Sequence, residues 1–342
     1  MLTAEAPVSE SSKRGDVGFS MQRAVLTIAT RKLLYLEMAI NLARSFLYWH
    51  NYSDIVFHIV TDLTPALPKD LKRVVLVHVQ PGQLGHGFAP KLHLDQLAPA
   101  RHTLFVDADC LCLGNLSSVF DRFVGRSVSV VGGTITQGEW FGDVAQLCAH
   151  FNVSCLPKFN GGIYYLEPGA KADAVYARAR ALYYKYDQLG LRRLRGHPTD
   201  ELLMAIAMAL EGCSALPDDG TILGDPFACP ILKEIDVLRG KCRLFNPPAP
   251  SPCHRNWYPA GEIQPLVVHM LGGFNGSWQY RAEEKKLRLV CERGLSETVA
   301  GPWVNWTYQR PAKLMDDARA MLRPTFHRMF GPRKIKVSDR CG

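Results

Sequence analysis

The chain has 342 residues, of which 47% are hydrophobic and 21% are charged, and its formal net charge is +8. These values are ordinary for a globular protein, and no apolar run approaches the roughly 18 residues that predict a membrane-spanning helix. The length suits one large α/β domain with additions, or two small domains. No motif for nucleic-acid binding occurs, so we expect no nucleic-acid partner.

The N-terminus and the cysteines bear on where the protein works. Residues 1–20 are expected to form a flexible tail, and the polar stretch 1–18 lacks the apolar core of a secretory signal. The ten cysteines include no CxxC pair and no zinc-like spacing. We therefore expect free thiols in a reducing compartment, and a cytoplasmic location.

The first half of the chain alternates predicted strands with predicted helices. Strands are predicted at 24–29, 55–60, 74–79, 103–107, 111–113 and 127–131, with helices at 31–49 and, interrupted by Pro90, at 88–97. This alternation predicts an α/β fold with a mainly parallel, doubly wound sheet. Right-handed crossovers would bring Thr30, Asp62 and Asp107 to one edge of that sheet.

The second half is less regular. A glycine pair precedes a strand within 159–166, helices are predicted at 170–189 and 199–210, and a short strand at 266–269. Residues 214–264, rich in proline and glycine, are expected to fold as irregular structure over the sheet. A helix is predicted at 312–322.

The C-terminal segment is basic. Residues 308–342 carry nine Lys or Arg against three Asp or Glu, a net charge of +6. This charge is compatible with peripheral contact to anionic lipid, with binding of a polyanion, or with a solvated tail.

Asp107 and Asp109 directly follow the apolar run 103–106. Residues two apart in a strand point to the same side, so both carboxylates would face one way, with Ala108 turned away. Adjacent carboxylates repel each other unless a cation or a shared proton relieves them, and hard oxygen ligands suit Mg²⁺ or Mn²⁺. The pair thus predicts a divalent-metal site that neutralises a diphosphate; the alternative is a strand end followed by a polar turn.

Five segments occur in a specific order: Ala29-Thr30; Phe88-Ala-Pro-Lys91 ahead of Phe105-Val-Asp-Ala-Asp109; Phe159-Asn-Gly-Gly-Ile-Tyr-Tyr-Leu166; Pro198-Thr-Asp-Glu201; and Val268-His-Met-Leu-Gly272. Over roughly residues 23–278, this order resembles the GT-A nucleotide-sugar glycosyltransferases, most closely glycosyltransferase family 8. The resemblance implies a GT-A (Rossmann-like) domain at 21–280, whose mainly parallel sheet is flanked by helices, followed by a basic helical extension at 281–342.

The resemblance also implies roles for individual residues. Asp107, Asp109 and His269 match the metal ligands, with Mn²⁺ (or Mg²⁺) as the ion; a capped core histidine is the other interpretation of His269. The positions that border the donor nucleotide, its phosphates and its sugar are Ala29, Thr30, Tyr35, Lys91, Asp107, Ala108, Gly161, Gly162, Gly272 and Asn275. Tyr35 would stack on the base or fill the core, and Lys91 would approach the phosphates or lie solvated on the surface.

Three polar residues match the catalytic positions. Asn160 matches the segment beside the transferred sugar, and Glu201, preceded by Asp200, matches a polar position beneath the anomeric carbon. A carboxylate at 201, where the family more often has an amide, would stabilise an oxocarbenium ion or act as a nucleophile. Thr199 is also expected to cap the helix that begins here.

The chain departs from the family pattern at two places. Thr30-Arg31 replace the acidic residue that reads uracil, and Asn275 replaces a lysine that clamps the phosphates. That clamp is either lost or replaced, by Lys91 or by an arginine of Arg192-Arg193-Leu-Arg195. Together these features predict a metal-dependent, hexosyltransferase-type glycosyltransferase. It would move a sugar from a nucleoside-diphosphate sugar, with UDP as the expected nucleotide, to a hydroxyl-bearing acceptor, with retention of anomeric configuration.

The acceptor is left open as a glycan, a glycolipid, a protein or a small molecule. Two other functions are compatible with the same residues. A sugar nucleotidyltransferase uses similar acidic metal pairs, although the glycine-rich loop expected after its first strand does not occur here. A non-catalytic, sugar-binding relative of the fold is the other alternative.

Overall fold

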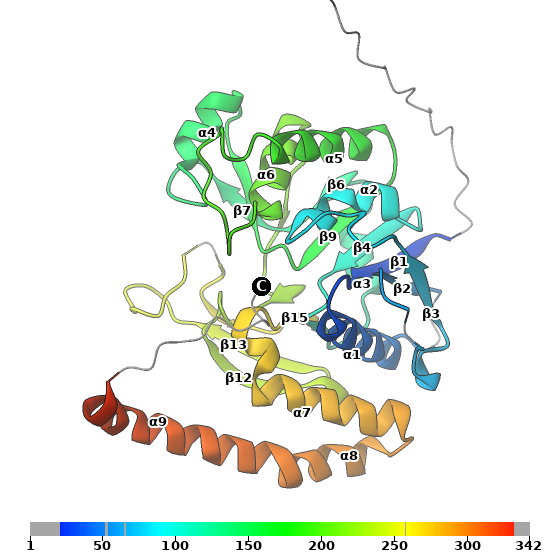
Figure 1. Ribbon diagram of the computed structural model, residues 1–342, viewed down its shortest axis with the longest axis vertical. Helices are drawn as coiled ribbons and strands as arrows, with labels where there is room; N and C mark the ends of the chain where they lie inside the picture. The colour runs from blue at the N-terminus through cyan, green and yellow to red at the C-terminus, as the bar shows by residue number, and fades with distance from the viewer. Residues whose placement is uncertain (1–20, 52–53, 65, 257, 332–342) are drawn as a thin grey trace, which may run out of the picture.

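A computed structural model describes residues 21–51, 54–64, 66–256 and 258–331. The predicted tail at 1–20 and the basic residues beyond 331 lie outside these ranges. No helix of the described residues is long and apolar enough to cross a membrane. Figure 1 shows strands at the centre of the molecule with helices on both sides of them.

The central sheet has six strands in the order β3-β2-β1-β4-β9-β6. They are β1 (Arg23–Ile28), β2 (Val56–Thr61), β3 (Val74–His78), β4 (His102–Val106), β6 (Val128–Ser129) and β9 (Ile163–Leu166). The pairs β3·β2, β2·β1 and β1·β4 are parallel, whereas β9 is antiparallel to both β4 and β6. The predicted mainly parallel α/β sheet is thus confirmed.

Helices cover both faces of this sheet because its strands are apolar on both sides. Val25 and Leu104 belong to a buried cluster with α1 (Leu33–Trp49), whereas Leu26 and Phe105 belong to a second cluster with α5 (Ala170–Tyr183) and α6 (Asp200–Leu210). Successive residues of a strand face opposite sides, so each strand contributes to both clusters. Figure 1 shows α1 and the α5–α6 pair on opposite sides of β1 and β4.

Three small sheets complete the strands. The first has the strand order β11 (Leu223–Gly224), β15 (Val267–His269), β5 (Cys110–Cys112). The second has the order β10 (Leu216–Pro217), β7 (Val131–Ile135), β8 (Leu156–Phe159). The third has the order β12 (Ile231–Asp236), β13 (Lys241–Asn246), β14 (Gly261–Ile263). Short helices follow individual strands of the central sheet and of these small sheets. They are η1 (Lys69–Leu71), η2 (Ala89–His93), α2 (Leu94–Leu97), α3 (Ser117–Phe123), α4 (Val144–Phe151), η3 (Val237–Arg239) and η4 (Gly272–Gly276).

Several predictions of secondary structure were wrong. The expected irregular region 214–264 contains the antiparallel sheet β12-β13-β14, and β13 shows the reason: Cys242 and Leu244 are buried while Lys241 and Arg243 are exposed. This alternation of period two is typical of a half-buried strand. The predicted strand 127–131 is split between β6 and β7, and the helix predicted at 170–189 ends at Tyr183.

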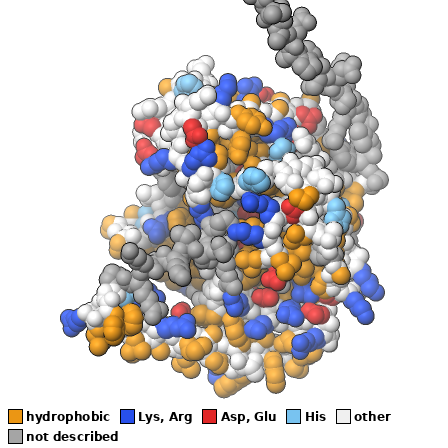
Figure 2. All heavy atoms as spheres, in the orientation of Figure 1, with side chains coloured by type: hydrophobic (Ala, Val, Ile, Leu, Met, Phe, Trp, Pro, Cys, Tyr) orange, Lys and Arg blue, Asp and Glu red, His pale blue; other side chains and the backbone are white. Residues whose placement is uncertain are grey.

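Helices form the C-terminal part of the described chain. They are α7 (Trp278–Leu287), the π-helical turn η5 (Arg288–Glu292), α8 (Glu297–Val304), the π-helical turn η6 (Asn305–Gln309) and α9 (Arg310–Phe330). The buried Glu283 ties α7 to the body by accepting a hydrogen bond of 2.7 Å from the Val237 amide. The helix predicted at 312–322 lies within α9, and the predicted domain boundary at residue 280 lies within α7. Figure 2 shows hydrophobic and basic side chains together along the lower edge, where Figure 1 draws α8 and α9.

Candidate functional site

A cleft of about 460 Å³ lies at the carboxyl edge of β1 and β4. Ligands of open α/β sheets bind at this edge, and the volume is that of a small-molecule site. Eight predicted donor or metal residues line the cleft: Thr30, Tyr35, Lys91, Asp107, Ala108, Asp109, Gly272 and Asn275. Its lining also includes residues that were given no site role: Arg31, Lys32, His86, Gly87 and His197.

The ends of β1 and β2 meet at this cleft as the crossover rule predicts. The Asp62 carboxylate accepts a hydrogen bond of 2.7 Å from the Arg31 amide, and Arg31 has φ of 72°. Asp62 thus holds the chain in a left-handed turn that few non-glycine residues adopt. Ala29, predicted to border the nucleoside, is fully buried and hydrogen-bonds through its amide to Val60. It lies behind the cleft wall, whereas Thr30 lines the cleft.

The three predicted metal ligands come together, although one is far from the other two in the sequence. His269 Nε2 lies 3.0 Å from Asp109 Oδ1 and 3.7 Å from Asp107 Oδ2. The antiparallel pairing of β15 with β5 places His269 opposite Cys110, next to the acidic pair. The ends of β4 and β15 therefore form one cluster of ligand atoms.

These distances fit a six-coordinate divalent ion. At metal–ligand distances of about 2.1 Å, neighbouring ligand atoms of an octahedron lie about 3.0 Å apart, which is the separation of His269 Nε2 and Asp109 Oδ1. Asp107 Oδ2 is farther from His269 Nε2, at 3.7 Å, and is held by Lys91 at 2.7 Å. Two carboxylates and an imidazole are also the donor set that Mn²⁺ and Mg²⁺ accept.

Cys110 offers a different third ligand. Ligand atoms of Asp109, Cys110 and His269 all lie within 4.8 Å of one another. However, Cys110 is fully buried, and burial followed by the negative charge of Asp109 raises the pKa of its thiol well above 9.0. A protonated thiol is a poor ligand for a hard cation, so we assign the third position to Asp107.

Asn160 fixes the orientation and tautomer of His269. Asn160 Oδ1 lies 2.7 Å from His269 Nδ1 and also accepts a hydrogen bond from the Gly162 amide, while Asn160 Nδ2 donates to Asp225 Oδ2 at 3.0 Å. These contacts leave oxygen as the only atom that Asn160 presents to His269. His269 Nδ1 must therefore carry a proton, which leaves Nε2 free to bind a metal when the ring is neutral.

The same close packing explains the glycine at position 162. A Cβ atom there would lie 2.6 Å from His269 Nδ1. Only glycine permits the histidine to approach this closely. Gly162 therefore leaves room for the imidazole of His269 beside Asp109.

Charge pairing shifts the pKa values of this cluster. Burial alone would lower the pKa of His269, but Asp109, Asp107 and Asp225 outweigh it and raise that pKa to about 9. Burial would conversely raise the pKa of Asp109, but its ion pair with His269 outweighs this and lowers the pKa. Asn275 also hydrogen-bonds Asp109. The Asp109 carboxylate is thus held ionised, the form that binds a cation.

Lys91 is already engaged with the acidic residues. Its Nζ donates to Asp107 Oδ2 at 2.7 Å and to the Gly161 carbonyl at 3.0 Å, and lies 3.7 Å from Asp200 Oδ2. Burial would lower the pKa of Lys91, but Asp107 and Asp200 outweigh it and raise the pKa. The lysine thus partly neutralises the carboxylates of Asp107 and Asp200.

The predicted catalytic acids lie at the start of α6, where Asp200 is buried and Glu201 is half-buried. Glu201 Oε1 accepts a hydrogen bond of 2.7 Å from the Gly161 amide, and Asp200 Oδ2 accepts one of 2.6 Å from the Tyr164 hydroxyl. Burial raises the pKa of both carboxyls. Thr199 occupies the position before the helix, but its side chain makes no capping hydrogen bond, so the predicted capping role was wrong.

Of the three basic residues in the loop 192–195, only Arg195 lines the cleft. Arg192 pairs with Glu139 and Arg193 with Asp187, both away from it. Arg195 Nη2 lies 3.6 Å from the point where a Cβ on Gly272 would stand, so the guanidinium approaches the glycine turn after β15. In the described residues no hydrogen bond or ion pair is found for Arg195, and we single it out as a cation available to a ligand.

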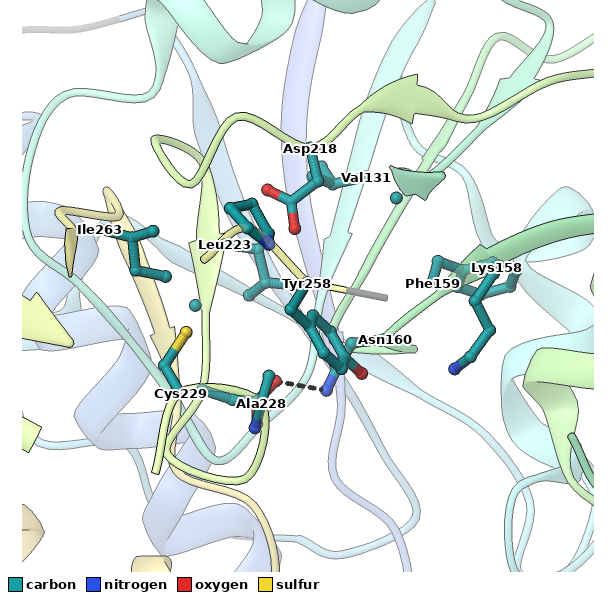
Figure 3. Close-up of a pocket in the computed structure, with 14 residues that line it drawn as sticks. Val131, Lys158, Phe159, Asn160, Asp218, Leu223, Ala228, Cys229, Tyr258 and Ile263 are labelled. Atoms are coloured by element: carbon teal, nitrogen blue, oxygen red, sulfur yellow. Dashed lines mark hydrogen bonds between the residues drawn. The ribbon is translucent and has the colours of Figure 1, made fainter. Parts of the chain in front are cut away.

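A second hollow lies on the other side of Asn160. Figure 3 shows Tyr258, Lys158 and Asp218 around it, with the hydrogen bond from Asn160 drawn as a dashed line. Its volume of about 20 Å³ has room for roughly one water molecule, not a sugar. The larger cleft is therefore the candidate site, and this hollow contains the contacts that support it.

No protein-family model matches the chain, and no curated protein matches it. Similar solved structures include the galactosyltransferase LgtC in complex with donor and acceptor sugar analogues, which is 13% identical with a TM-score of 0.49 and covers 73% of this chain and 87% of its own. Mouse xyloside xylosyltransferase 1 is 12% identical with a TM-score of 0.44 and covers 73% and 97%. The glycosyltransferase GlyE of Streptococcus pneumoniae is 14% identical with a TM-score of 0.40 and covers 57% and 45%. Because these likenesses are distant, we argue the function from the side chains of this chain.

Proposed function

We propose that the protein is a metal-dependent glycosyltransferase of the GT-A type, related to family 8, that takes a nucleoside-diphosphate sugar as donor and a hydroxyl-bearing acceptor. The observation that carries this proposal is the convergence of His269 with Asp107 and Asp109, the two acids that line the cleft. Two carboxylates and a histidine with Nε2 directed at them suit a divalent cation. A diphosphate is the ligand that such an ion and a nearby arginine would hold together.

A bound Mn²⁺ or Mg²⁺ would supply Lewis-acid stabilisation of the negative charge that develops on the leaving diphosphate. The chain's own residues prepare this chemistry. Asp107, Asp109 and His269 would hold the ion, Asn160 keeps the proton of His269 on Nδ1, and Lys91 stabilises the charge of the acidic cluster from behind. The site is therefore organised before the donor binds.

Arg195 is assigned to the diphosphate in the proposal. The family pattern has a phosphate-binding lysine where this chain has Asn275. Arg195 would supply the positive charge in its place, because it borders Gly272 and is not paired with an acid in the described residues. A guanidinium can bind phosphate oxygens with two parallel hydrogen bonds. Asn275, which contacts Asp109, is left with a support role for the metal ligand.

Glu201 and Asp200 are assigned to the sugar side of the site. The backbone of Gly161 connects Glu201 with Lys91, because its amide donates a hydrogen bond to Glu201 and its carbonyl accepts one from Lys91. A carboxylate at 201 would stabilise positive charge on the transferred sugar, in keeping with transfer that retains the anomeric configuration. The base of the nucleotide is proposed to lie along Thr30 and Tyr35.

The test is a screen of nucleotide sugars for release of free nucleoside diphosphate with and without Mn²⁺. We expect release from at least one donor, loss of that release on chelation, and loss of about a thousandfold in Asp109→Asn, because several kcal/mol of charge stabilisation depend on the metal. Asp316→Asn, which changes an exposed carboxylate of α9, should leave the rate unchanged.

Three results would overturn the proposal. Release that persists in chelator or in Asp109→Asn would remove the metal from the mechanism. No release from any donor would favour a non-catalytic sugar-binding protein. Release of pyrophosphate from a nucleoside triphosphate and a sugar phosphate would identify a nucleotidyltransferase instead.

A further inference from the structure

The C-terminal helices expose an apolar surface that the proposed site does not use. None of the residues of α9 is buried. Its large apolar side chains are highly exposed: Leu314 68%, Met315 56%, Met321 79%, Leu322 66%, Met329 68% and Phe330 69%. Scattered exposed apolar residues are common in proteins, but a continuous apolar surface marks an interaction site.

These side chains lie on one face of the helix. Leu314, Ala318, Leu322 and Met329 recur at the spacing that places residues on one side of an α-helix. Asp316, Ala320 and His327 lie on the opposite side at the same spacing. Helix α9 is therefore amphipathic, and its apolar side is exposed along with its polar side.

Two exposed tryptophans lie in the helical segment that precedes α9. Trp303 in α8 is 60% exposed and Trp306 in η6 is 64% exposed. Arg310 lies over the ring of Trp306, with its guanidinium carbon 3.8 Å from the ring centroid. Exposed tryptophans beside arginine are typical of segments at the boundary between lipid headgroups and acyl chains. We call the surface formed by Trp303, Trp306 and the apolar side of α9 the C-terminal apolar face.

The charge around this face is positive. Helix α9 contains five Lys or Arg, namely Arg310, Lys313, Arg319, Arg323 and Arg328, against two acids, Asp316 and Asp317. The residues that continue the chain raise the net charge of 308–342 to +6. Figure 2 shows blue and orange side chains interspersed along this edge. A second copy of the chain docked here would bring like charges together, whereas anionic lipid supplies the opposite sign.

We propose that the C-terminal apolar face binds the surface of a bilayer that contains anionic lipid, with α9 lying in the plane of the interface. The apolar side chains would enter the acyl boundary while the long stems of the arginines reach back to the headgroups. This inference concerns a surface of the protein and does not depend on the proposed sugar transfer.

Vesicle binding tests the inference directly. The full chain is mixed with phosphatidylcholine vesicles that contain or lack phosphatidylserine, and bound protein is measured by co-sedimentation and by tryptophan emission. We expect binding only with phosphatidylserine, a blue shift of the emission, and weakening as salt is raised, by about fivefold for each Lys or Arg contact that is screened.

A pair of double variants separates the apolar face from the rest of the helix. Leu314→Ser with Leu322→Ser should reduce vesicle binding by at least tenfold, because two large side chains no longer enter the lipid. Ala320→Ser with His327→Ser, on the opposite side of α9, should bind as the unchanged protein does. Circular dichroism confirms that both variants are folded, which is expected because all four positions are exposed.

Three results would overturn the inference. The first is the absence of binding to phosphatidylserine vesicles, and the second is an equal loss in both double variants. The third is a protein that does not bind vesicles but dimerises as its concentration rises, with dimerisation lost in the double leucine variant. That result would identify the C-terminal apolar face as a contact between two copies of the chain. Nucleoside diphosphate release without vesicles is measured in parallel, so failure of lipid binding is distinguishable from failure of the proposed activity.

Discussion

The acidic cluster around Lys91 and the loop that carries Arg195 both place a cation at the wall of the cleft, but one cation is paired with acids and the other is not. In the acidic cluster, Lys91 is half-buried and is held by Asp107, Asp200 and a backbone carbonyl. In the loop, Arg195 lines the cleft and is not paired with an acid in the described residues. A charge whose partners lie within the chain supports the fold, whereas a charge directed at an open cleft is available to a ligand. The two regions should therefore respond differently to mutation.

The largest effect on stability is expected in the acidic cluster. Asp200→Ala removes the acceptor of the Tyr164 hydroxyl and one of the neighbours of Lys91, both in buried surroundings. Breaking such a network leaves unpaired groups in the interior, and we expect a loss of about 3 kcal/mol in the free energy of unfolding. Urea denaturation measures it. Asp316→Ala, at an exposed position of α9, serves as the control and should change the stability by less than about 0.5 kcal/mol.

The loop should show the converse behaviour. Arg195→Gln removes a charge that would contact the donor diphosphate, so we expect kcat/KM for the donor to fall by about 10- to 100-fold. The unfolding midpoint should not change. Arg193→Gln is the matched control, because Arg193 pairs with Asp187 away from the cleft. Equal losses of activity in the two variants would contradict the division between the loop and the acidic cluster.

A smaller effect is expected one contact away from the metal ligands. Asp225→Asn replaces the oxygen that accepts a hydrogen bond from Asn160 Nδ2 with an amide donor, so two donors would face each other. Asn160 cannot relieve this by turning its amide over, because its Oδ1 accepts a hydrogen bond from the Gly162 amide. We expect Asn160 to lose its fixed position and Mn²⁺ affinity to fall by about tenfold. The affinity is measured by titration of free Mn²⁺ with electron paramagnetic resonance, in the presence of UDP. Asp218 is a half-buried acid whose carboxylate accepts a hydrogen bond from the Gly220 amide instead, so Asp218→Asn should bind Mn²⁺ normally.

The sequence predicted those parts of the site that local pattern encodes. The apolar run before Asp107 predicted a buried strand with two carboxylates at its end, and the structure contains it. His269 could be proposed only from the family resemblance, because the pairing of β15 with β5 that brings it to Asp109 joins distant segments. The roles of the glycines were also hidden, since only packing shows that a side chain at Gly162 would strike His269.

Long-range contacts explain what sequence reasoning missed. Asn160 hydrogen-bonds to Asp225, 65 positions away in the sequence, and to His269, 109 positions away. No local sequence pattern predicts contacts between residues so far apart. Arg195 was one of several candidate arginines, and only the partners of Arg192 and Arg193 distinguish it. By contrast, the sheet in 214–264 was missed although β13 alternates in the sequence, because the prolines and glycines around it favoured a loop.

The three-residue strand β15 determines which mutations this chain can tolerate. Consecutive side chains of a strand face opposite sides, so sliding β15 by one position against β5 would put Val268 beside Asp109 and turn the imidazole into the core. A single inserted or deleted codon in the short segment before Val267 that shifts this register would therefore remove His269 from the proposed metal site without changing any of the proposed ligands. We expect length changes there to be far less tolerable than substitutions.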